Sequence, residues 1–320
     1  MFNVFQSKRA LRIYGISVLG VALVCVVLRL VGMLFFFDKE IGYYESGSVI
    51  PTLFTVLLIA AVVVSFALCF IPKLRVEPKN PQNTRAVSSS AFFPDAGFAS
   101  YALTYGISLF DYINMTGSVP FLYVFTLLCA ILACVFYCII ALSKKTDTVL
   151  YLACGILAIV LMILTLAECY FDTFVQMNSP TKIIFQFAML SAMLLTVNEL
   201  RAGIGASRPS FHLFAATVAA IFLPTSAIPS LICYYTGNMS VNYVLSQADF
   251  TLFMLAVFAI VRLVQLCFGK DTPVEVTEDA QEVADAEAET ADAVNNETEE
   301  ITLDTTEETT NEKDNEGEGV

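Results

Sequence analysis

The chain has 320 residues, of which 57% are apolar and only 15% charged, and its mean hydropathy is +0.71. Soluble domains have about 45–50% apolar and about 25% charged residues, so the composition excludes an ordinary water-soluble globular protein. The net charge of −13 is unevenly divided, because residues 271–320 carry 19 acidic side chains and a single lysine, whereas residues 1–270 have a net charge of +5. The sequence therefore predicts a polytopic membrane domain over residues 1–270 and a polar acidic tail over 271–320.

Long apolar stretches predict an all-α membrane domain with about eight transmembrane helices. A helix needs about 20 mainly apolar residues to cross the hydrocarbon core of a bilayer. Six stretches satisfy this requirement: 13–37, 49–71, 120–142, 148–171, 211–235 and 250–268. Two weaker stretches, 96–110 and 183–197, contain 15 residues each and bring the count to eight.

The positions of the basic residues decide between seven and eight spans. Lysine and arginine concentrate in cytoplasmic loops. With eight spans and a cytoplasmic N-terminus, twelve of the basic residues in 1–270 lie in inner loops. The outer loops contain Lys39 and Lys182, and the spans contain Arg29 and Arg262. Without the 96–110 span, Lys144 and Lys145 would lie outside, so the sequence predicts a multi-pass protein of the cell membrane with both termini cytoplasmic.

A weak internal repeat suggests that the domain consists of four tandem helical hairpins. The first three outward-running spans end in a phenylalanine–aspartate pair: Phe37-Asp38, Phe110-Asp111 and Phe171-Asp172. Two of the returning spans begin with a Gly-Ser-Val stretch followed by proline, near Pro51 and Pro120. Chance is the alternative explanation, because the chain has 26 phenylalanines and aspartate is common at the outer membrane face.

Arg29 and Arg262 are the most unusual residues of the predicted spans. An arginine at the centre of a membrane helix costs about 2.5–3.5 kcal/mol on insertion scales, so it usually faces protein or water and has a partner. Three acidic residues are candidate partners for Arg29: Glu168, Asp111 and Asp172. Three polar residues lie at the depth of Arg262: Gln265, Asn198 and Glu199. Structural pairing, or extension of the side chains to the headgroups, is the alternative to a role in a substrate or ion pathway.

The 211–235 span contains two prolines, Pro224 and Pro229. Each lacks an N–H and frees the carbonyl four residues earlier, which are those of Ala220 and Thr225. Three hydroxyl side chains are placed to help satisfy these carbonyls: Thr225, Ser226 and Ser230. Interrupted helices often mark the site of a transporter, so this stretch is a candidate solute pathway. An ordinary proline kink is the alternative, since membrane helices tolerate proline.

Enzymatic, metal and nucleic-acid functions lack support in the sequence. His212 is the only histidine, which excludes a bis-histidine haem and an HExxH zinc helix, and its place at the start of a span predicts an interface residue. The nine cysteines lie in apolar segments without a CxxC pair and are interpreted as packing residues. The basic residues lie in short loops, which excludes a nucleic-acid surface. We therefore predict no enzyme, no cofactor and no metal.

The sequence supports two functional hypotheses. The first is a small-solute permease or transport-related subunit in the lipid bilayer. Its candidate pathway residues are Arg29, Glu168, Pro224, Thr225, Ser226, Pro229 and Arg262. The second is a non-catalytic membrane scaffold or sensor, in which the tail over residues 271–320 is disordered and recruits a cytoplasmic protein.

Overall fold

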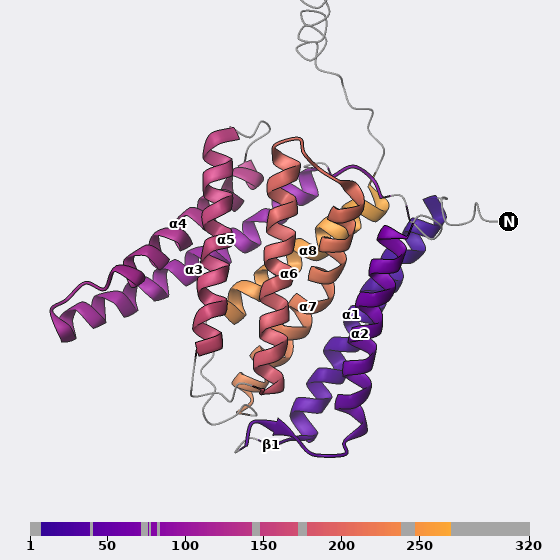
Figure 1. Ribbon diagram of the computed structural model, residues 1–320, viewed down its shortest axis with the longest axis horizontal. Helices are drawn as coiled ribbons and strands as arrows, with labels where there is room; N and C mark the ends of the chain where they lie inside the picture. The colour runs from indigo at the N-terminus through magenta and orange to yellow at the C-terminus, as the bar shows by residue number, and fades with distance from the viewer. Residues whose placement is uncertain are drawn as a thin grey trace, which may run out of the picture. The chain divides into compact units, whose positions relative to one another are not determined.

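The computed structural model describes residues 8–38, 41–71, 76, 78–81, 84–142, 148–171, 178–237 and 247–269. These residues belong to a compact unit of residues 1–269, and the predicted tail lies outside the described part of the chain. Figure 1 shows the helices and the short strands. In chain order they are α1 (Lys8–Phe35), β1 (Phe37–Asp38), β2 (Tyr43–Tyr44), α2 (Val49–Phe70), α3 (Arg85–Thr116), α4 (Phe121–Leu142), α5 (Thr148–Phe171), α6 (Pro180–Gly203), α7 (Pro209–Tyr235) and α8 (Gln247–Phe268).

Helix boundaries follow local signals in the sequence. Thr84 caps α3 by accepting a hydrogen bond from the Val87 N–H at 3.4 Å. The same helix ends at Gly117, whose φ of 68° lies in the left-handed region that favours glycine. The helices α6 and α7 begin with Pro180 and Pro209, where the missing N–H leaves no helical hydrogen bond unmade. Each boundary therefore has a local backbone cause.

The predicted membrane character is confirmed, because seven helices are long and apolar enough to cross a bilayer. The exception among the described helices is α3, which runs over 32 residues and includes Arg85, Asp95 and Asp111. The sequence predicted only residues 96–110 of this helix, because the polar residues outside that stretch lower the mean hydropathy. An eighth membrane crossing, formed by α3, stays a prediction.

The span predicted over 183–197 is too short, since α6 continues to Gly203 and includes Asn198 and Glu199. Both polar side chains are buried inside the protein rather than exposed to lipid. Hydropathy averages penalise such residues, although their surroundings are protein. The length of α6 therefore depends on tertiary contacts, which the hydropathy of the sequence does not predict.

A short β-hairpin follows α1, where the sequence predicted that the span would continue to residue 37. The strands are antiparallel, with Phe37 paired to Tyr44 and Asp38 paired to Tyr43. The rings of Phe37 and Tyr44 meet edge to face, 5.6 Å apart between centroids. Gly42 has a φ of 79° and allows the tight reversal between the strands. This hairpin is the one departure from an all-α fold among the described residues.

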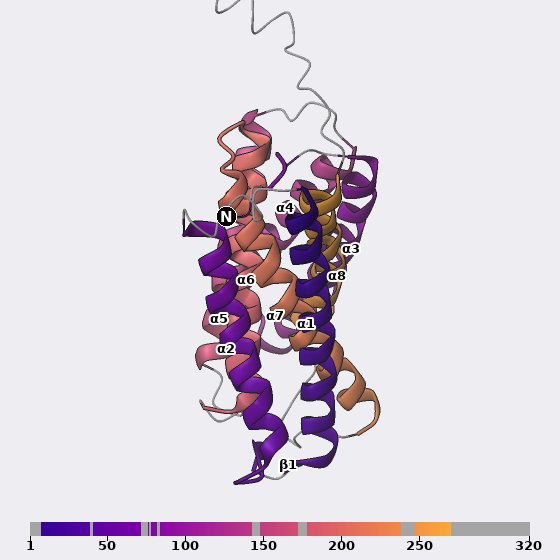
Figure 2. The same cartoon turned by 90° about the vertical axis from the view of Figure 1, so that its right-hand side faces the viewer.

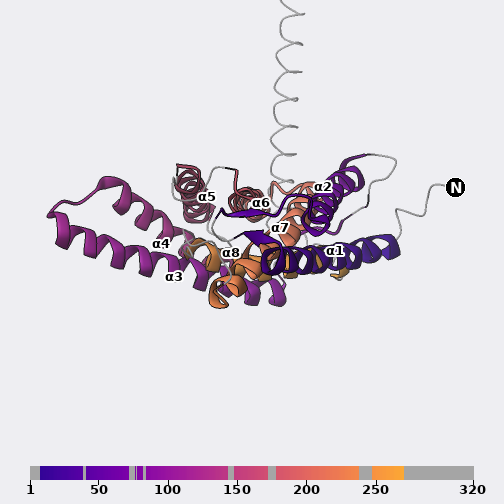
Figure 3. The same cartoon turned by 90° about the horizontal axis from the view of Figure 1, so that it is seen from below.

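The central helix of the bundle is α7, which packs against α1, α2, α6 and α8. Figure 2 shows α7 in the gap between α1 and α2, and Figure 3 shows it between this pair and α6. Consecutive helices pack as the pairs α1–α2, α3–α4, α5–α6 and α7–α8, but α4–α5 and α6–α7 pack together as well. The four tandem hairpins and their duplication therefore stay predictions. Helix α8 ends at the end of the bundle where α1 begins (Figure 1). Buried positions along α7 are therefore the interior of the membrane domain.

Gly155 of α5 allows close packing where α4, α5 and α6 meet. A Cβ atom there would lie 2.6 Å from Leu200 Cδ1 and 2.9 Å from Phe136 Cε2. We expect Gly155→Ala to lower the free energy of unfolding by about 1–3 kcal/mol, because the added methyl group overpacks this contact. Unfolding of the purified protein in mixed detergent micelles measures the change.

Gly20 of α1 supplies the matched control, because nothing lies within 4 Å of a Cβ atom added there. We expect Gly20→Ala to raise stability by about 0.5–1 kcal/mol, since alanine loses less backbone entropy in a helix than glycine does. Equal destabilisation by the two substitutions would contradict the close approach at Gly155.

Candidate functional site in the helix bundle

Arg29 of α1 is buried against the middle of α7, and only 1% of its surface is exposed. Its Nη1 donates hydrogen bonds to the carbonyl oxygens of Thr225 at 2.5 Å and Ser226 at 3.0 Å. Its Nη2 lies 3.5 Å from Ser230 Oγ. The guanidinium therefore binds α7 at the stretch that begins with Pro224, and we call this group the arginine–hydroxyl cluster.

Pro229 explains why α7 accepts the arginine at this point. Because proline has no N–H, the Thr225 carbonyl lacks its usual helical donor four residues later. Arg29 supplies that donor from a neighbouring helix. The expected interruption of the helix is wrong, since α7 is continuous from Pro209 to Tyr235. The freed Thr225 carbonyl predicted from the sequence is nevertheless where the arginine binds.

Three buried polar atoms of the arginine–hydroxyl cluster have no hydrogen-bond partner among the described residues. They are Arg29 Nε, Thr225 Oγ1 and Ser226 Oγ. The side chains of Thr225 and Ser226 are at most 1% exposed. An unsatisfied buried polar group lowers the stability of a protein by about 1–3 kcal/mol. The three atoms can therefore form further hydrogen bonds with a bound molecule.

Glu168, one of the three candidate partners of Arg29, does not pair with it. Glu168 is exposed near the end of α5 and accepts a hydrogen bond from the Tyr105 hydroxyl at 3.1 Å. Helix α1 packs against α2, α7 and α8, whereas α5 packs against α4 and α6. The sequence placed Arg29 and Glu168 at a similar depth in the membrane, but it did not show that they lie on different sides of the bundle. Asp111 is likewise exposed, near the end of α3, and Asp172 lies outside the described residues.

Tyr44 connects the arginine–hydroxyl cluster to the β-hairpin at the end of the bundle. Burial raises the pKa of the Tyr44 hydroxyl, and the nearby positive charge of Arg29 opposes this shift. The ring of Tyr44 also packs near Gly32, one turn after Arg29 on α1. The cluster therefore extends from the interior toward the end of the bundle where α1 ends.

A second buried cluster joins α6, α7 and α8 near the opposite end of the bundle. Arg262 Nε donates to Glu199 Oε1 at 2.6 Å, and Arg262 Nη2 donates to the other carboxylate oxygen. His212 Nε2 lies 2.9 Å from Glu199 Oε1. The three side chains are at most 2% exposed, and we call them the charged triad. Along α7, His212 lies about 21 Å from Ser226, because a helix rises 1.5 Å per residue.

Of the three polar residues expected at the depth of Arg262, Glu199 and Gln265 contact its side chain. Gln265 Oε1 accepts a hydrogen bond from Arg262 Nη1 at 3.3 Å. The Tyr151 hydroxyl donates to the Glu199 backbone carbonyl at 2.8 Å and fixes the end of α6. The ring of Phe258 lies 5.8 Å from the Arg262 guanidinium carbon. The position of this arginine is thus determined by protein groups on several helices.

The role expected for His212 at a membrane interface is wrong, because this side chain is completely buried. An ionised carboxylate only accepts hydrogen bonds, so Nε2 of His212 is the donor to Glu199. His212 Nδ1 has no partner within the described chain. The sequence contained a signal for the contact between Glu199 and His212, because the two residues flank the short connection between α6 and α7.

The fold and the two buried clusters define the class of the protein as a polytopic α-helical integral membrane protein. Comparisons with protein families, curated proteins and solved structures found no match.

Proposed function

We propose that the protein is a small-solute permease or transport-related subunit, and that its solute is a small anion bound at the arginine–hydroxyl cluster. The observation that carries this proposal is the difference between the two buried arginines. Arg262 has the carboxylate of Glu199 as its counter-ion, whereas Arg29 contacts only carbonyl and hydroxyl oxygens among the described residues. A buried charge without a counter-ion is expensive in a membrane, and such residues commonly serve a substrate or ion pathway.

The unpartnered groups of this cluster fit a small anion. Guanidinium N–H groups and hydroxyl groups both donate hydrogen bonds, and arginine matches planar oxyanions such as carboxylates. Arg29 Nε, Thr225 Oγ1 and Ser226 Oγ are free to bind among the residues that the structure describes. The neighbouring prolines reduce the number of helical hydrogen bonds that a local rearrangement of α7 must break. The charged triad, in contrast, is internally paired and serves to hold α6, α7 and α8 together.

Uptake measurements test the proposal. The purified protein is reconstituted into phospholipid vesicles, and influx of labelled acetate, chloride and nitrate is compared with influx of sodium. We expect uptake of at least one of these anions, reduced about tenfold or more by Thr225→Val, because a hydrogen bond to a charged group contributes about 1.5–3 kcal/mol. Thr225→Val preserves the shape of the side chain and both arginine–carbonyl hydrogen bonds.

Ser90→Ala is the matched control, because Ser90 is a buried hydroxyl of α3 that donates to the Val87 carbonyl at 2.8 Å. This variant should transport as the unaltered protein does. Absence of uptake for all three anions, or equal uptake by Thr225→Val and Ser90→Ala, would refute the anion site.

The alternative proposal is a membrane scaffold or sensor whose tail recruits a cytoplasmic protein. Its support is the concentration of 19 acidic side chains and one lysine within residues 271–320. Such a segment attracts basic partners when it lies on the same side of the membrane as they do. In this case deletion of residues 271–320 should abolish recovery of a cross-linked basic partner from cells, whereas Thr225→Val should leave it unchanged.

A further inference from the structure

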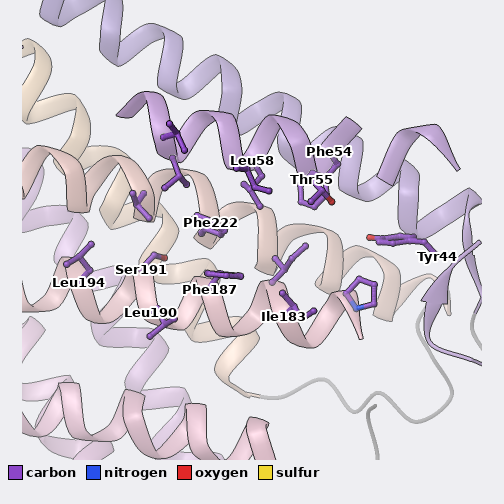
Figure 4. A pocket seen from close by; sticks show the side chains of 16 residues that line it. Tyr44, Phe54, Thr55, Leu58, Ile183, Phe187, Leu190, Ser191, Leu194 and Phe222 are labelled. Carbon is purple, nitrogen blue, oxygen red and sulfur yellow. The ribbon is translucent and has the colours of Figure 1, made fainter. Parts of the chain in front are cut away.

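An apolar groove of about 600 Å³ lies between α2 and α6 and is floored by α7. Figure 4 shows Phe54 and Leu58 of α2 facing Ile183 and Phe187 of α6, with Phe222 of α7 between them. This volume falls in the range of small-molecule sites, which is about 300–1,000 Å³. The groove shares Tyr44 with the surroundings of Arg29, but Arg29, Thr225 and Ser226 are not part of its lining.

The groove opens sideways on the outer surface of the bundle. Ile59 and Val63 on its α2 side and Phe187 and Leu190 on its α6 side are all exposed. In a helix bundle that crosses a membrane, exposed apolar side chains of this kind face hydrocarbon. The groove is therefore continuous with the surface that contacts lipid chains.

We propose that this groove binds a hydrocarbon chain of a membrane lipid, whose polar headgroup lies at the Tyr44 end. The groove extends along α6 from Pro180 to Leu194, or about 21 Å at 1.5 Å per residue. One leaflet of the hydrocarbon core is about 15 Å deep, so the groove is long enough for a chain that enters from one leaflet. Tyrosine is typical of the boundary between headgroups and hydrocarbon, and Tyr44 of β2 lies at one end of the groove in Figure 4.

The groove lining requires almost no hydrogen bonds from a bound molecule. Its two hydroxyl side chains inside the groove, Thr55 and Ser191, donate to the carbonyl oxygens of Pro51 and Ala188 at 2.9 and 2.7 Å. With their donors already used, they do not require a polar ligand. A saturated or unsaturated hydrocarbon chain satisfies such a surface through burial and dispersion contacts alone.

A lipid chain fits this groove better than a helix from another protein does. Membrane helices associate closely through glycine, alanine and serine, which allow their backbones to approach. Among the described residues, the lining contains no glycine and no alanine, and Ser191 is its one serine. Its floor and walls carry large side chains such as Phe54, Phe187 and Phe222. A flexible chain adapts to this uneven surface more readily than a helix about 10 Å wide does.

The absence of tryptophan from the chain permits a direct test. Phe222→Trp places a single indole on the groove floor, at a residue that is only 6% exposed. Ile131→Trp is the reference, because Ile131 lies in the middle of α4 and is 47% exposed. Each variant is reconstituted in phosphatidylcholine vesicles with or without bromine in the middle of the acyl chains. We expect strong quenching of both indoles by brominated chains.

A groove-filling substitution separates a bound chain from the surrounding bilayer. Val62 lines the groove, whereas the neighbouring Val64 is exposed outside its lining. Added to Phe222→Trp, Val62→Phe should weaken binding of the brominated chain about tenfold, because its ring displaces roughly two methylene groups of the lipid. Val64→Phe should not change quenching, and neither substitution should affect the Ile131→Trp indole.

Two results would overturn the proposal. Brominated chains that fail to quench the Phe222→Trp indole would show that another part of the protein, a second copy or a partner occupies the groove. Quenching that Val62→Phe and Val64→Phe leave equally unchanged would show ordinary surface lipid only. If Phe222→Trp does not fold, Phe187→Trp on the α6 wall carries the same test, with the same two outcomes.

Discussion

Glu199→Leu is expected to lower the free energy of unfolding by about 3–5 kcal/mol, because it leaves the charge of Arg262 buried without a counter-ion. The carboxylate accepts hydrogen bonds from Arg262 Nε and Nη2 and from His212 Nε2. All three side chains are at most 2% exposed, so water cannot replace the lost acceptor. Equilibrium unfolding in mixed detergent micelles, followed by loss of helical circular dichroism, measures the effect.

The double variant Glu199→Leu/Arg262→Met should recover most of this loss, because it removes both charges and fills their space with apolar groups. Glu168→Gln is the matched control, since Glu168 is an exposed glutamate that accepts a hydrogen bond from Tyr105. Its substitution should change stability by less than about 1 kcal/mol. A double variant that is as unstable as the sum of the two single variants would contradict the coupling of the pair.

Arg29→Met should lower the free energy of unfolding by about 1–3 kcal/mol, because it leaves the Thr225 carbonyl buried without a donor. Pro229→Ala restores an N–H group that can bond this same carbonyl along α7. The double variant Arg29→Met/Pro229→Ala should therefore be more stable than the sum of the single effects predicts. A double-mutant cycle, measured by unfolding in micelles, gives this coupling energy.

Pro224→Ala distinguishes this specific coupling from a general benefit of removing proline. The carbonyl that Pro224 frees is that of Ala220, one turn away from the carbonyls bound by Arg29. Combined with Arg29→Met, Pro224→Ala should be additive. If Pro224→Ala and Pro229→Ala rescued the arginine variant equally, Arg29 would not act as the substitute donor for the Thr225 carbonyl.

Several elements could be predicted from sequence because their boundaries depend on local properties. The stretches 49–71, 120–142 and 148–171 match α2, α4 and α5 within one residue at each end. They are continuous apolar runs next to turn or polar residues, so hydropathy alone marks them. In contrast, the predicted 96–110 and 183–197 spans fall short of α3 and α6. The end of α6 carries Asn198, which the fold buries against protein, whereas the ends of α3 carry the exposed Arg85 and Asp111.

The candidate sites could be predicted only in part. Arg262 and Glu199 were expected at the same depth, and a buried arginine requires a partner, so Glu199 was one of its candidate partners. The partner of Arg29 could not be found in this way, because its ligands are backbone carbonyls of α7 rather than a carboxylate. His212 was missed for a related reason, since its burial depends on how α7 packs at the end of α6.

The amino-acid sequence by itself determined that the protein is helical and membrane-spanning, with arginines inside its apolar stretches, because apolar run length and charge content act through local chemistry. Only the tertiary structure decided which side of each helix faces which neighbour. That choice separates Arg29 from Glu168, gathers Glu199, His212 and Arg262, and leaves a groove between α2 and α6. Helix rotation and packing arise from contacts between residues far apart in the chain, which hydropathy does not encode.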